Sequence, residues 1–207
     1  MPENLHKLFV ISSPSGGGKT SLINKVFEDS RSANFEKSIS DTSRQKRQGD
    51  LEGKDYYFLS EKDFKEKIKK EEYVEYATVF GNFYGTSKNE IKTKYNNSNL
   101  VLELDWQGAY AVKKLFDDAK LIFLVPPSLD DLKQRLIKRN LDSSESIENR
   151  LSEAKKEISK SEMYDYLVLN DDFHKAFEDL SQILFEGISP IDFNSRASKD
   201  LIKRLVE

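Results

Sequence analysis

The sequence predicts an α/β protein built on a central parallel sheet, and three observations carry this prediction. An apolar run at 8–11 leads into a glycine-rich turn and then a helical pattern. Three later apolar runs are each followed by a helical pattern, at 100–104 and 106–116, at 121–125 and 129–139, and at 166–169 and 173–185. Strands that alternate with helices are typical of parallel sheets. Residues 35–97 differ in texture, and their short alternating strands and one helix predict a small inserted α+β domain.

The first strand is followed by the most informative segment, residues 13–20, which read SPSGGGKT and lead into the helix expected at 20–27. Glycines let successive backbone N–H groups point at phosphate oxygens, and the helix N-terminus adds positive partial charge. Lys19 can reach the outer phosphates, and the Thr20 hydroxyl can bind Mg²⁺. The chain is therefore expected to bind a nucleoside triphosphate, although glycine-rich turns also occur for conformational reasons alone.

This loop departs from the strict pattern G-x-x-x-x-G-K-[ST] at one position, because Ser13 stands where glycine is expected. If Ser13 had to adopt a positive φ, its Cβ would cost about 1 kcal/mol relative to glycine. Replacement of Ser13 by glycine would then stabilise the protein.

The inserted segment holds a second candidate phosphate site. Arg44 and Arg47 lie three residues apart, and Tyr56 follows nine residues after the second arginine. Arginine offers a planar fork of donors and tyrosine a directed hydroxyl, so the three side chains can converge on one phosphate. A polar surface loop explains the same stretch equally well. The mixed charges at 61–70 predict a solvated helix face instead.

The carboxyl ends of the predicted strands are where ligands gather in such a sheet. The glycine loop, Asp105, Pro126 and Asn170 all follow predicted strands. Glu103 and Asp105 form an acidic pair of the kind that faces Mg²⁺ or phosphate after a strand. Asp105 and Asn170 have a second interpretation, because each could cap the helix that follows it.

Two stretches outside the sheet carry expectations of their own. Residues 139–148 are rich in serine, include Asn140 and Asp142, and lie between two helices, so they are expected to form an irregular, mobile lid. Residues 197–206, after the break at Pro190, are expected to form one amphipathic helix.

Composition excludes several classes of function. The 207 residues contain no cysteine, so thiol nucleophiles, cysteine-based zinc sites and disulfide frameworks are excluded. With 33 basic and 36 acidic residues the net charge is only −3, which argues against a nucleic-acid partner. The N-terminus has no apolar signal segment, and no apolar run is long enough for a membrane span. We therefore expect a cytoplasmic protein with no membrane or nucleic-acid partner.

Several motifs follow one another along the chain: PSGGGKT at 14–20, TSR at 42–44, GKDY at 53–56, GNFYGT at 81–86, LDWQG at 104–108, PPS at 126–128 and RL at 150–151. In this order they resemble the guanylate kinase family, of the nucleoside monophosphate kinase group of P-loop NTPases, whose members convert GMP and ATP into GDP and ADP. The resemblance covers about residues 5–186, nearly the whole chain.

The resemblance implies a P-loop three-layer fold with a central parallel sheet, an inserted small α+β GMP-binding domain and a helical lid. The core domain would comprise residues 1–34 and 98–207. The GMP-binding insertion would be 35–97, and the lid segment within the core would be 139–152.

The same resemblance implies site residues and a Mg²⁺ cofactor. The side that binds ATP would consist of Ser15, Gly16, Gly17, Gly18, Lys19, Thr20 and Asn170, with Thr20 on Mg²⁺ and Asn170 near the adenine. The side that binds GMP would consist of Ser40, Arg44, Arg47, Asp50, Tyr56, Glu75, Tyr84, Thr86 and Asp105. The residues that act on the transferred phosphoryl group would be Lys19, Arg44, Arg135, Arg139 and Arg150. The chain has Asp41, Asp50 and Glu103 where the family usually has Ser, Glu and Asp.

Glu75 and Thr86 match the residues that read guanine in this family. A carboxylate accepts hydrogen bonds from both the guanine N1–H and the exocyclic amine, whereas adenine offers no such pair of donors. Taken alone, Glu75 could be a charged residue on the face of an edge strand. Arg135 and Arg139, four residues apart, could likewise form an ordinary exposed helix face.

The implied reaction needs no covalent intermediate, because a GMP phosphate oxygen attacks the γ-phosphorus of ATP in line while positive charge stabilises the transition state. Two alternatives stay open. One is a non-catalytic guanylate-kinase-like domain that binds phosphopeptides, against which Lys19 and Thr20 argue. The other is a kinase for a different monophosphate or phosphorylated sugar, against which Glu75 and Thr86 argue.

Overall fold

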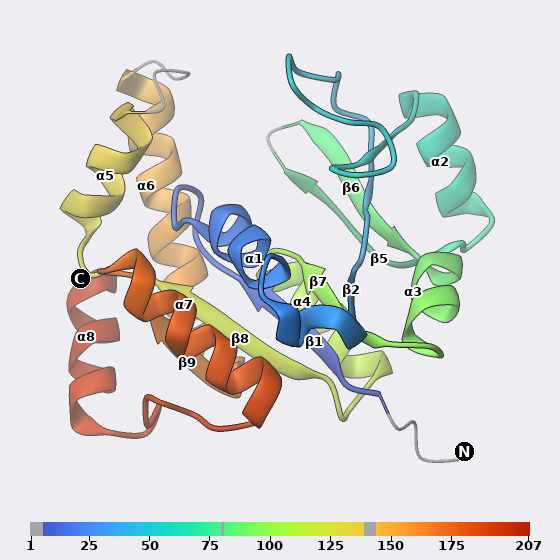
Figure 1. Cartoon of the computed structure of the whole chain (residues 1–207). Coiled ribbons are helices and arrows are strands. Elements are labelled where there is room, and N and C mark those ends of the chain that lie inside the picture. Colours follow the sequence, from blue (N-terminus) through green and yellow to red (C-terminus); the bar gives the residue numbers. More distant parts are fainter. Residues whose placement is uncertain (1–5, 80, 139–143) are drawn as a thin grey trace. The chain divides into compact units, whose positions relative to one another are not determined.

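The structure is a computed structural model that describes residues 6–79, 81–138 and 144–207 (Figure 1). Its strands form a five-stranded sheet in the order β2-β7-β1-β8-β9 and a four-stranded sheet in the order β4-β3-β6-β5. The chain divides into two compact units, Met1–Phe9 with Asn34–Ala119 and Val10–Ala33 with Lys120–Glu207. Strand β1 (Leu8–Ser12) contributes residues to both. The predicted α/β class with a parallel sheet is confirmed.

The second unit contains the glycine loop. Its elements are the end of β1, α1 (Lys19–Phe27), most of η1 (Ser30–Asn34), β8 (Lys120–Val125), α5 (Leu129–Lys138), α6 (Ser144–Ser159), η2 (Ser161–Met163), β9 (Tyr166–Leu169), α7 (Phe173–Ser181), η3 (Gln182–Glu186) and α8 (Arg196–Val206). Strands β8 and β9 pair in parallel, from Ile122 opposite Tyr166 to Val125 opposite Leu169. The last five residues of β8 are buried, as a central parallel strand requires.

The helix predicted at 173–185 is α7 followed by a single π-helical stretch, η3. Gly187 ends it with φ of 72°, a left-handed conformation that glycine adopts without steric cost.

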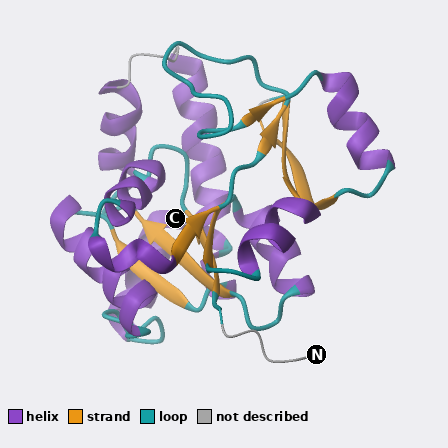
Figure 2. Cartoon of the chain, turned by 45° about the vertical axis from the view of Figure 1, so that its right-hand side comes forward, coloured by secondary structure: helices purple, strands orange, loops and turns teal. Residues whose placement is uncertain are grey.

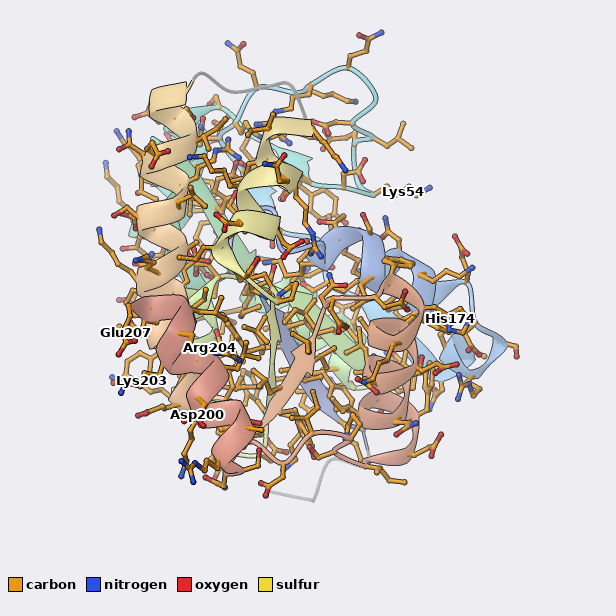
Figure 3. The ribbon with its side chains drawn as sticks, turned by 90° about the vertical axis from the view of Figure 1, so that its left-hand side faces the viewer. Lys54, His174, Asp200, Lys203, Arg204 and Glu207 are labelled. Carbon is orange, nitrogen blue, oxygen red and sulfur yellow. The ribbon has the colours of Figure 1, made fainter. Side chains whose placement is uncertain are left out.

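The amphipathic helix expected at 197–206 is confirmed as α8, which packs against α6. Leu205 is buried, whereas the polar residues labelled on α8 in Figure 3 are exposed. No helix in the described residues is both long and apolar enough to cross a membrane.

The first unit contains the four-stranded sheet; Figure 2 draws the strands of both sheets in orange. Its elements are the beginning of β1, β2 (Phe35–Lys37), β3 (Asp41–Thr42), β4 (Tyr57–Phe58), α2 (Glu61–Lys69), β5 (Tyr73–Val79), β6 (Asn82–Ser87), α3 (Lys88–Tyr95), β7 (Asn99–Glu103) and α4 (Trp106–Leu115). Strand β6 pairs antiparallel with both β5 and β3, and β3 pairs in parallel with β4. Strand β2 pairs in parallel with β7.

Helix α2 is fixed to this sheet by Phe64, which is fully buried. The Phe64 ring stacks on the rings of Tyr73 and Phe83, with centroids 4.6 and 5.4 Å apart. Apart from the half-buried Ile68, the other residues of the helix are charged and mostly exposed, so the solvated helix face expected at 61–70 is confirmed, with one aromatic anchor on the opposite face.

The predicted domain boundaries stay a prediction. They place β7 and α4 in the core segment 98–207, whereas the first compact unit includes both elements together with residues 35–97. Both elements belong to the first unit because β7 pairs with β2 and α4 packs against β5.

The segment expected to be irregular at 139–148 is helical from Ser144 onward, so that part of the prediction is wrong. Ile147 is buried, and helices α5 and α6 pack against each other. The ammonium group of Lys133 on α5 also lies 2.8 Å from the Glu148 carboxylate on α6. Tertiary packing therefore stabilises a helix that the serine-rich composition does not indicate. Residues 139–143 of the predicted lid segment 139–152 lie outside the described residues.

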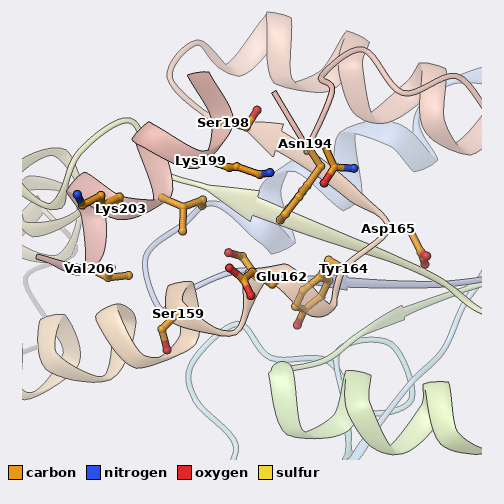
Figure 4. Close-up of a pocket in the computed structure, with 12 residues that line it drawn as sticks. Ser159, Glu162, Tyr164, Asp165, Asn194, Ser198, Lys199, Lys203 and Val206 are labelled. Carbon is orange, nitrogen blue, oxygen red and sulfur yellow. The ribbon is translucent and has the colours of Figure 1, made fainter. Parts of the chain in front are cut away.

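A pocket of about 740 Å³ lies in the second unit between the end of α6, η2 and α8 (Figure 4). Tyr164 and Glu162 line one side of this pocket, and Lys199 and Lys203 of α8 line another. The pocket shares no lining residue with the sites predicted from the sequence.

Candidate functional site

The glycine loop of the second unit joins β1 to α1. The Gly17 N–H donates to the Pro14 carbonyl at 2.8 Å, which closes a tight turn. Gly16 and Gly18 both have φ of 88°, a region that L-residues with a Cβ rarely adopt. Gly18 is also the N-cap of α1 and places no side chain over the end of the helix. The first-turn N–H groups of α1 can therefore face an anion.

Ser13 does not have the strained backbone considered above. Within the described ranges Glu71 is the only non-glycine residue with positive φ. The Ser13 side chain is buried, and its hydroxyl donates to the Pro14 carbonyl at 3.2 Å. The close approach falls at Gly17 instead, where an added Cβ would lie 3.0 Å from the Ser13 Cβ. The expected gain from glycine at position 13 is therefore wrong.

Asn170 lies directly after β9 and contacts the glycine loop. Its side chain is buried, and its Nδ2 donates to the Gly17 carbonyl at 2.7 Å. The helix that follows is capped by Asp172, which accepts from the Lys175 N–H. The helix-cap interpretation of Asn170 is thus wrong, while its contact with adenine stays a prediction.

Two of the three predicted lid arginines bind this part of the second unit. Arg135 of α5 donates from Nη2 to the Asn170 carbonyl at 2.7 Å, and Arg150 of α6 donates from Nη1 to the Ser15 hydroxyl at 3.2 Å. Neither arginine is therefore an ordinary exposed helix residue. Arg139 lies outside the described residues. Lys19 and Thr20 occupy the first turn of α1, where Lys19 is half-buried and Thr20 is exposed.

The first unit contains a buried carboxylate, that of Glu75 on β5. Glu75 pairs across the sheet with Thr86 of β6 and accepts hydrogen bonds from its side chain and main chain. Burial raises the pKa of Glu75 to about 7, and the negative charge of Asp105 adds to the increase. Its Oε1 atom is buried and has no hydrogen-bond partner within the described part of the chain. β5 is an edge strand, as considered above, but Glu75 is buried and is not part of an exposed charged face.

Gly108 of α4 makes this arrangement possible, and the sequence analysis assigned it no role. A Cβ at Gly108 would lie 2.9 Å from Glu75 Oε2 and 3.1 Å from the Leu104 Cβ. Asp105 caps the same helix, because its Oδ1 accepts from the Gly108 N–H at 2.9 Å. The cap interpretation of Asp105 is confirmed, and its contact with a substrate stays a prediction. The glycine in the motif LDWQG was the available signal for a close approach.

The structure brings Ser40 to the same place, because its hydroxyl lies 3.4 Å from that of Thr86. Asp41, the next residue, is buried and forms an ion pair with Lys67. It also accepts a hydrogen bond from the Tyr73 hydroxyl at 2.8 Å, which ties α2 and β5 to β3. Asp41 thus stabilises the sheet.

The predicted phosphate cluster of the first unit is partly assembled. The guanidinium of Arg44 lies 5.4 Å from the centre of the Tyr56 ring, which meets the Tyr84 ring edge to face at 5.7 Å. Arg44 Nη1 also lies 2.9 Å from Asp50 Oδ2, so Asp50 holds the arginine in place. The side chain of Arg47 is exposed, and its backbone N–H donates to Asp50 at 2.8 Å.

The protonation states of Asp50 and Tyr56 in this cluster follow from the groups around them. The Arg47 N–H, together with Arg44, lowers the pKa of Asp50, so Asp50 stays ionised. Burial raises the pKa of Tyr56 to about 12, and the negative charge of Glu103 adds to the increase. Tyr56 is therefore a neutral hydroxyl donor at neutral pH. Glu103 itself forms an ion pair with Lys37 of β2, with 2.9 Å between Nζ and Oε2.

Comparison with known proteins gives matches along nearly the whole chain. The family described as Guanylate kinase matches residues 5–187. The guanylate kinase of Wolbachia sp. subsp. Brugia malayi (strain TRS) is 45% identical over 184 residues, covering 88% of this chain and 93% of that protein. The guanylate kinase of Hahella chejuensis (strain KCTC 2396) is 47% identical over 178 residues, covering 86% and 85%. The crystal structure of guanylate kinase from Anaplasma phagocytophilum matches with a TM-score of 0.72 and 32% identity, covering 99% of this chain and 98% of that one.

Proposed function

Because the chain belongs to the guanylate kinase family, we propose that it transfers the γ-phosphoryl group of ATP to GMP and releases ADP and GDP. The observation that carries this proposal is the buried Glu75 carboxylate, whose Oε1 has no hydrogen-bond partner among the residues that the structure describes. A buried acceptor of this kind is costly unless a ligand donates to it. The N1–H and exocyclic amine of guanine supply two donors to one carboxylate, and adenine supplies no such pair.

The other residues of the first unit fit the rest of GMP. Thr86 orients Glu75, and Ser40 lies beside Thr86. Arg44, Tyr56 and Tyr84 provide a charged donor and two hydroxyls for the monophosphate. Arg47 extends this set from an exposed position, and Asp105 would act from the N-terminus of α4. Asp50 would serve the phosphate indirectly, because its carboxylate is bound to Arg44.

The second unit supplies the ATP side. The phosphates would lie on the N–H groups of Ser15–Gly18 and the first turn of α1, with Lys19 neutralising their charge. Arg150 already contacts Ser15 of this loop, and Arg135 contacts Asn170, which binds the loop. Both contacts support the assignment of these arginines to the transferred phosphoryl group. Arg139 is proposed for the same role from its place in the sequence alone. A complete loop with its lysine argues for catalysis and against the phosphopeptide-binding alternative.

We also propose Mg²⁺ as the cofactor, and the residues present fit it. Thr20 is exposed on the first turn of α1, where its hydroxyl can be one ligand. Magnesium in phosphoryl-transfer sites is bound by few protein groups and mainly by substrate phosphates and water. When bound, it would neutralise charge on the ATP phosphates.

The reaction is a single displacement. An oxygen of the GMP phosphate forms a bond to the γ-phosphorus, and the bond from that phosphorus to the β–γ bridging oxygen breaks, so ADP leaves with both electrons. Lys19, Arg135 and Arg150 stabilise the negative charge that spreads over the transferred group. We place this reaction in the cytoplasm, where both nucleotides are available.

The experiment that tests the proposal measures ADP formation from ATP with GMP, AMP, CMP and UMP as acceptors. We expect GMP to exceed each of the others by on the order of 10⁴ in kcat/KM, because the wrong base leaves Glu75 unpaired. Equal activity with AMP and GMP would contradict the proposed substrate. No ADP formation above the ATPase background with any acceptor would contradict the proposed reaction.

A further inference from the structure

The further inference concerns Asn170 and rests on the proposed binding of ATP at the glycine loop. The main chain of Asn170 is held by the sheet, because its N–H donates to the Val125 carbonyl at 2.9 Å and continues the pairing of β9 with β8. The residue is buried, with 4% of its surface exposed. The sheet therefore fixes the position of Asn170, so its side chain can in turn fix the glycine loop.

The side-chain amide of Asn170 fixes the orientation of one peptide group in the loop. Its Nδ2 donates to the Gly17 carbonyl at 2.7 Å. In a planar trans peptide the C=O and the following N–H point in opposite directions. With the Gly17 carbonyl turned toward Asn170, the Gly18 N–H must point to the other side of the peptide, away from Asn170.

Two neighbouring residues, Gly18 and Arg135, also approach Asn170 closely. A Cβ at Gly18 would lie 2.6 Å from Asn170 Nδ2, so the glycine lets the amide approach. The backbone carbonyl of Asn170 accepts a hydrogen bond from Arg135 Nη2 at 2.7 Å. One residue thus contacts both the loop and an arginine proposed to act on the transferred phosphoryl group.

We infer that Asn170 is a positioning residue for the phosphate loop: its buried amide holds the Gly17 carbonyl and thereby keeps the Gly18 N–H directed at the nucleotide phosphates. This role differs from contact with adenine, because it acts on any ligand that carries the phosphate chain, whatever base is attached.

The test compares ATP with inorganic tripolyphosphate, which has the same phosphate chain and no base. Affinities of both are measured by calorimetry for the full-length wild-type protein, Asn170→Ala and Asn170→Asp. Asn170→Asp keeps the shape of the side chain and replaces the donor by an oxygen that faces the Gly17 carbonyl. We expect about a tenfold loss of affinity for both ligands in Asn170→Ala, and at least as much in Asn170→Asp.

Two measurements separate this effect from a general loss of folding. GMP affinity in the same variants should equal that of the wild-type protein. Asn97→Asp is the matched control, because the Asn97 amide also donates to a backbone carbonyl, that of Thr93 at 2.9 Å, but on an exposed helix end. It should leave both affinities unchanged.

A loss of ATP affinity with unchanged tripolyphosphate affinity would assign Asn170 to the adenine and overturn the inference. Wild-type affinity for tripolyphosphate in Asn170→Asp would also overturn it. Neither result would affect the proposed transfer to GMP, which the comparison of acceptors in the wild-type protein tests separately.

Discussion

The glycine loop and the cluster around Glu75 present their polar groups in different ways. In the loop, positive φ at Gly16 and Gly18 turns the main chain so that N–H groups lie at the start of α1. Around Glu75, a side-chain carboxylate is buried against α4, and one of its oxygens has no hydrogen-bond partner in residues 6–79, 81–138 and 144–207. Main-chain donors suit phosphate, which every nucleotide carries, whereas a buried carboxylate suits one base. We infer that the loop determines affinity for the triphosphate and that Glu75 determines the choice of acceptor.

The largest effect is expected for Lys19→Met, which removes the positive charge of the Lys19 side chain beside the glycine loop. It leaves Glu75 and its neighbour Thr86 unchanged. Turnover with ATP and GMP should fall about 10³-fold, because one preorganised charge on the transferred group is lost. GMP affinity, measured by calorimetry, should stay unchanged. Lys25→Met is the control, since Lys25 lies on the same helix and pairs with the exposed Glu28. An equal loss of GMP affinity in Lys19→Met would place Lys19 on the acceptor side.

The next effect is a dependence of GMP affinity on pH. Burial raises the pKa of Glu75 from 4.5 to about 7, so the free protein holds a proton on this carboxyl below that pH. Guanine donates to the ionised form, so GMP affinity should fall about tenfold per pH unit below 7 and reach a plateau above it. Glu75→Gln should retain only the pH dependence of the GMP phosphate itself. Identical pH profiles for the two proteins would contradict this account.

A smaller effect is expected for Gly108→Ala, which adds a Cβ where Glu75 Oε2 and Leu104 approach. Displacement of the carboxylate should raise the KM for GMP about tenfold and leave the KM for ATP unchanged. Ala111→Gly, one turn further along α4, is the control. It should cost about 1 kcal/mol of stability without changing either KM. A rise in both KM values for Gly108→Ala would show that the substitution disturbs more than Glu75.

The smallest effect is expected for Ser13→Gly. Ser13 has an ordinary backbone, so glycine relieves no strain and adds conformational freedom to the unfolded chain. The free energy of unfolding, from urea denaturation, should fall by about 0.5–1 kcal/mol. An increase in stability would show that position 13 is strained after all.

The two regions also differ in how far the sequence predicts them. The glycine loop is contiguous, and the strand before it and the helix after it are confirmed. Chain-wide alternation likewise predicted the parallel sheet. The burial of Glu75 cannot be predicted from the residues next to it in the sequence. It depends on α4, whose Gly108 lies 33 positions further along the chain. Only the family resemblance singled out Glu75 in advance.

Asn170 and residues 144–148 illustrate the same limit. A polar residue before a helix suggests a cap, yet Asp172 caps α7 and the Asn170 amide binds Gly17, a residue 153 positions away in the chain. Serines between two helices suggest a loop, yet Ile147 is buried and the helix begins at Ser144. In both cases a contact distant in sequence overrides the local preference.

The most direct test of the central claim measures ADP and GMP affinity by calorimetry for Lys19→Met and Glu75→Gln. The account predicts that each variant loses affinity for one ligand: Lys19→Met for ADP and Glu75→Gln for GMP, the latter by about 100-fold because an ionised acceptor of two hydrogen bonds is replaced. The other affinity should equal that of the wild-type protein in each case. If Glu75→Gln weakened ADP as much as GMP, the separation of phosphate binding from base choice would be contradicted.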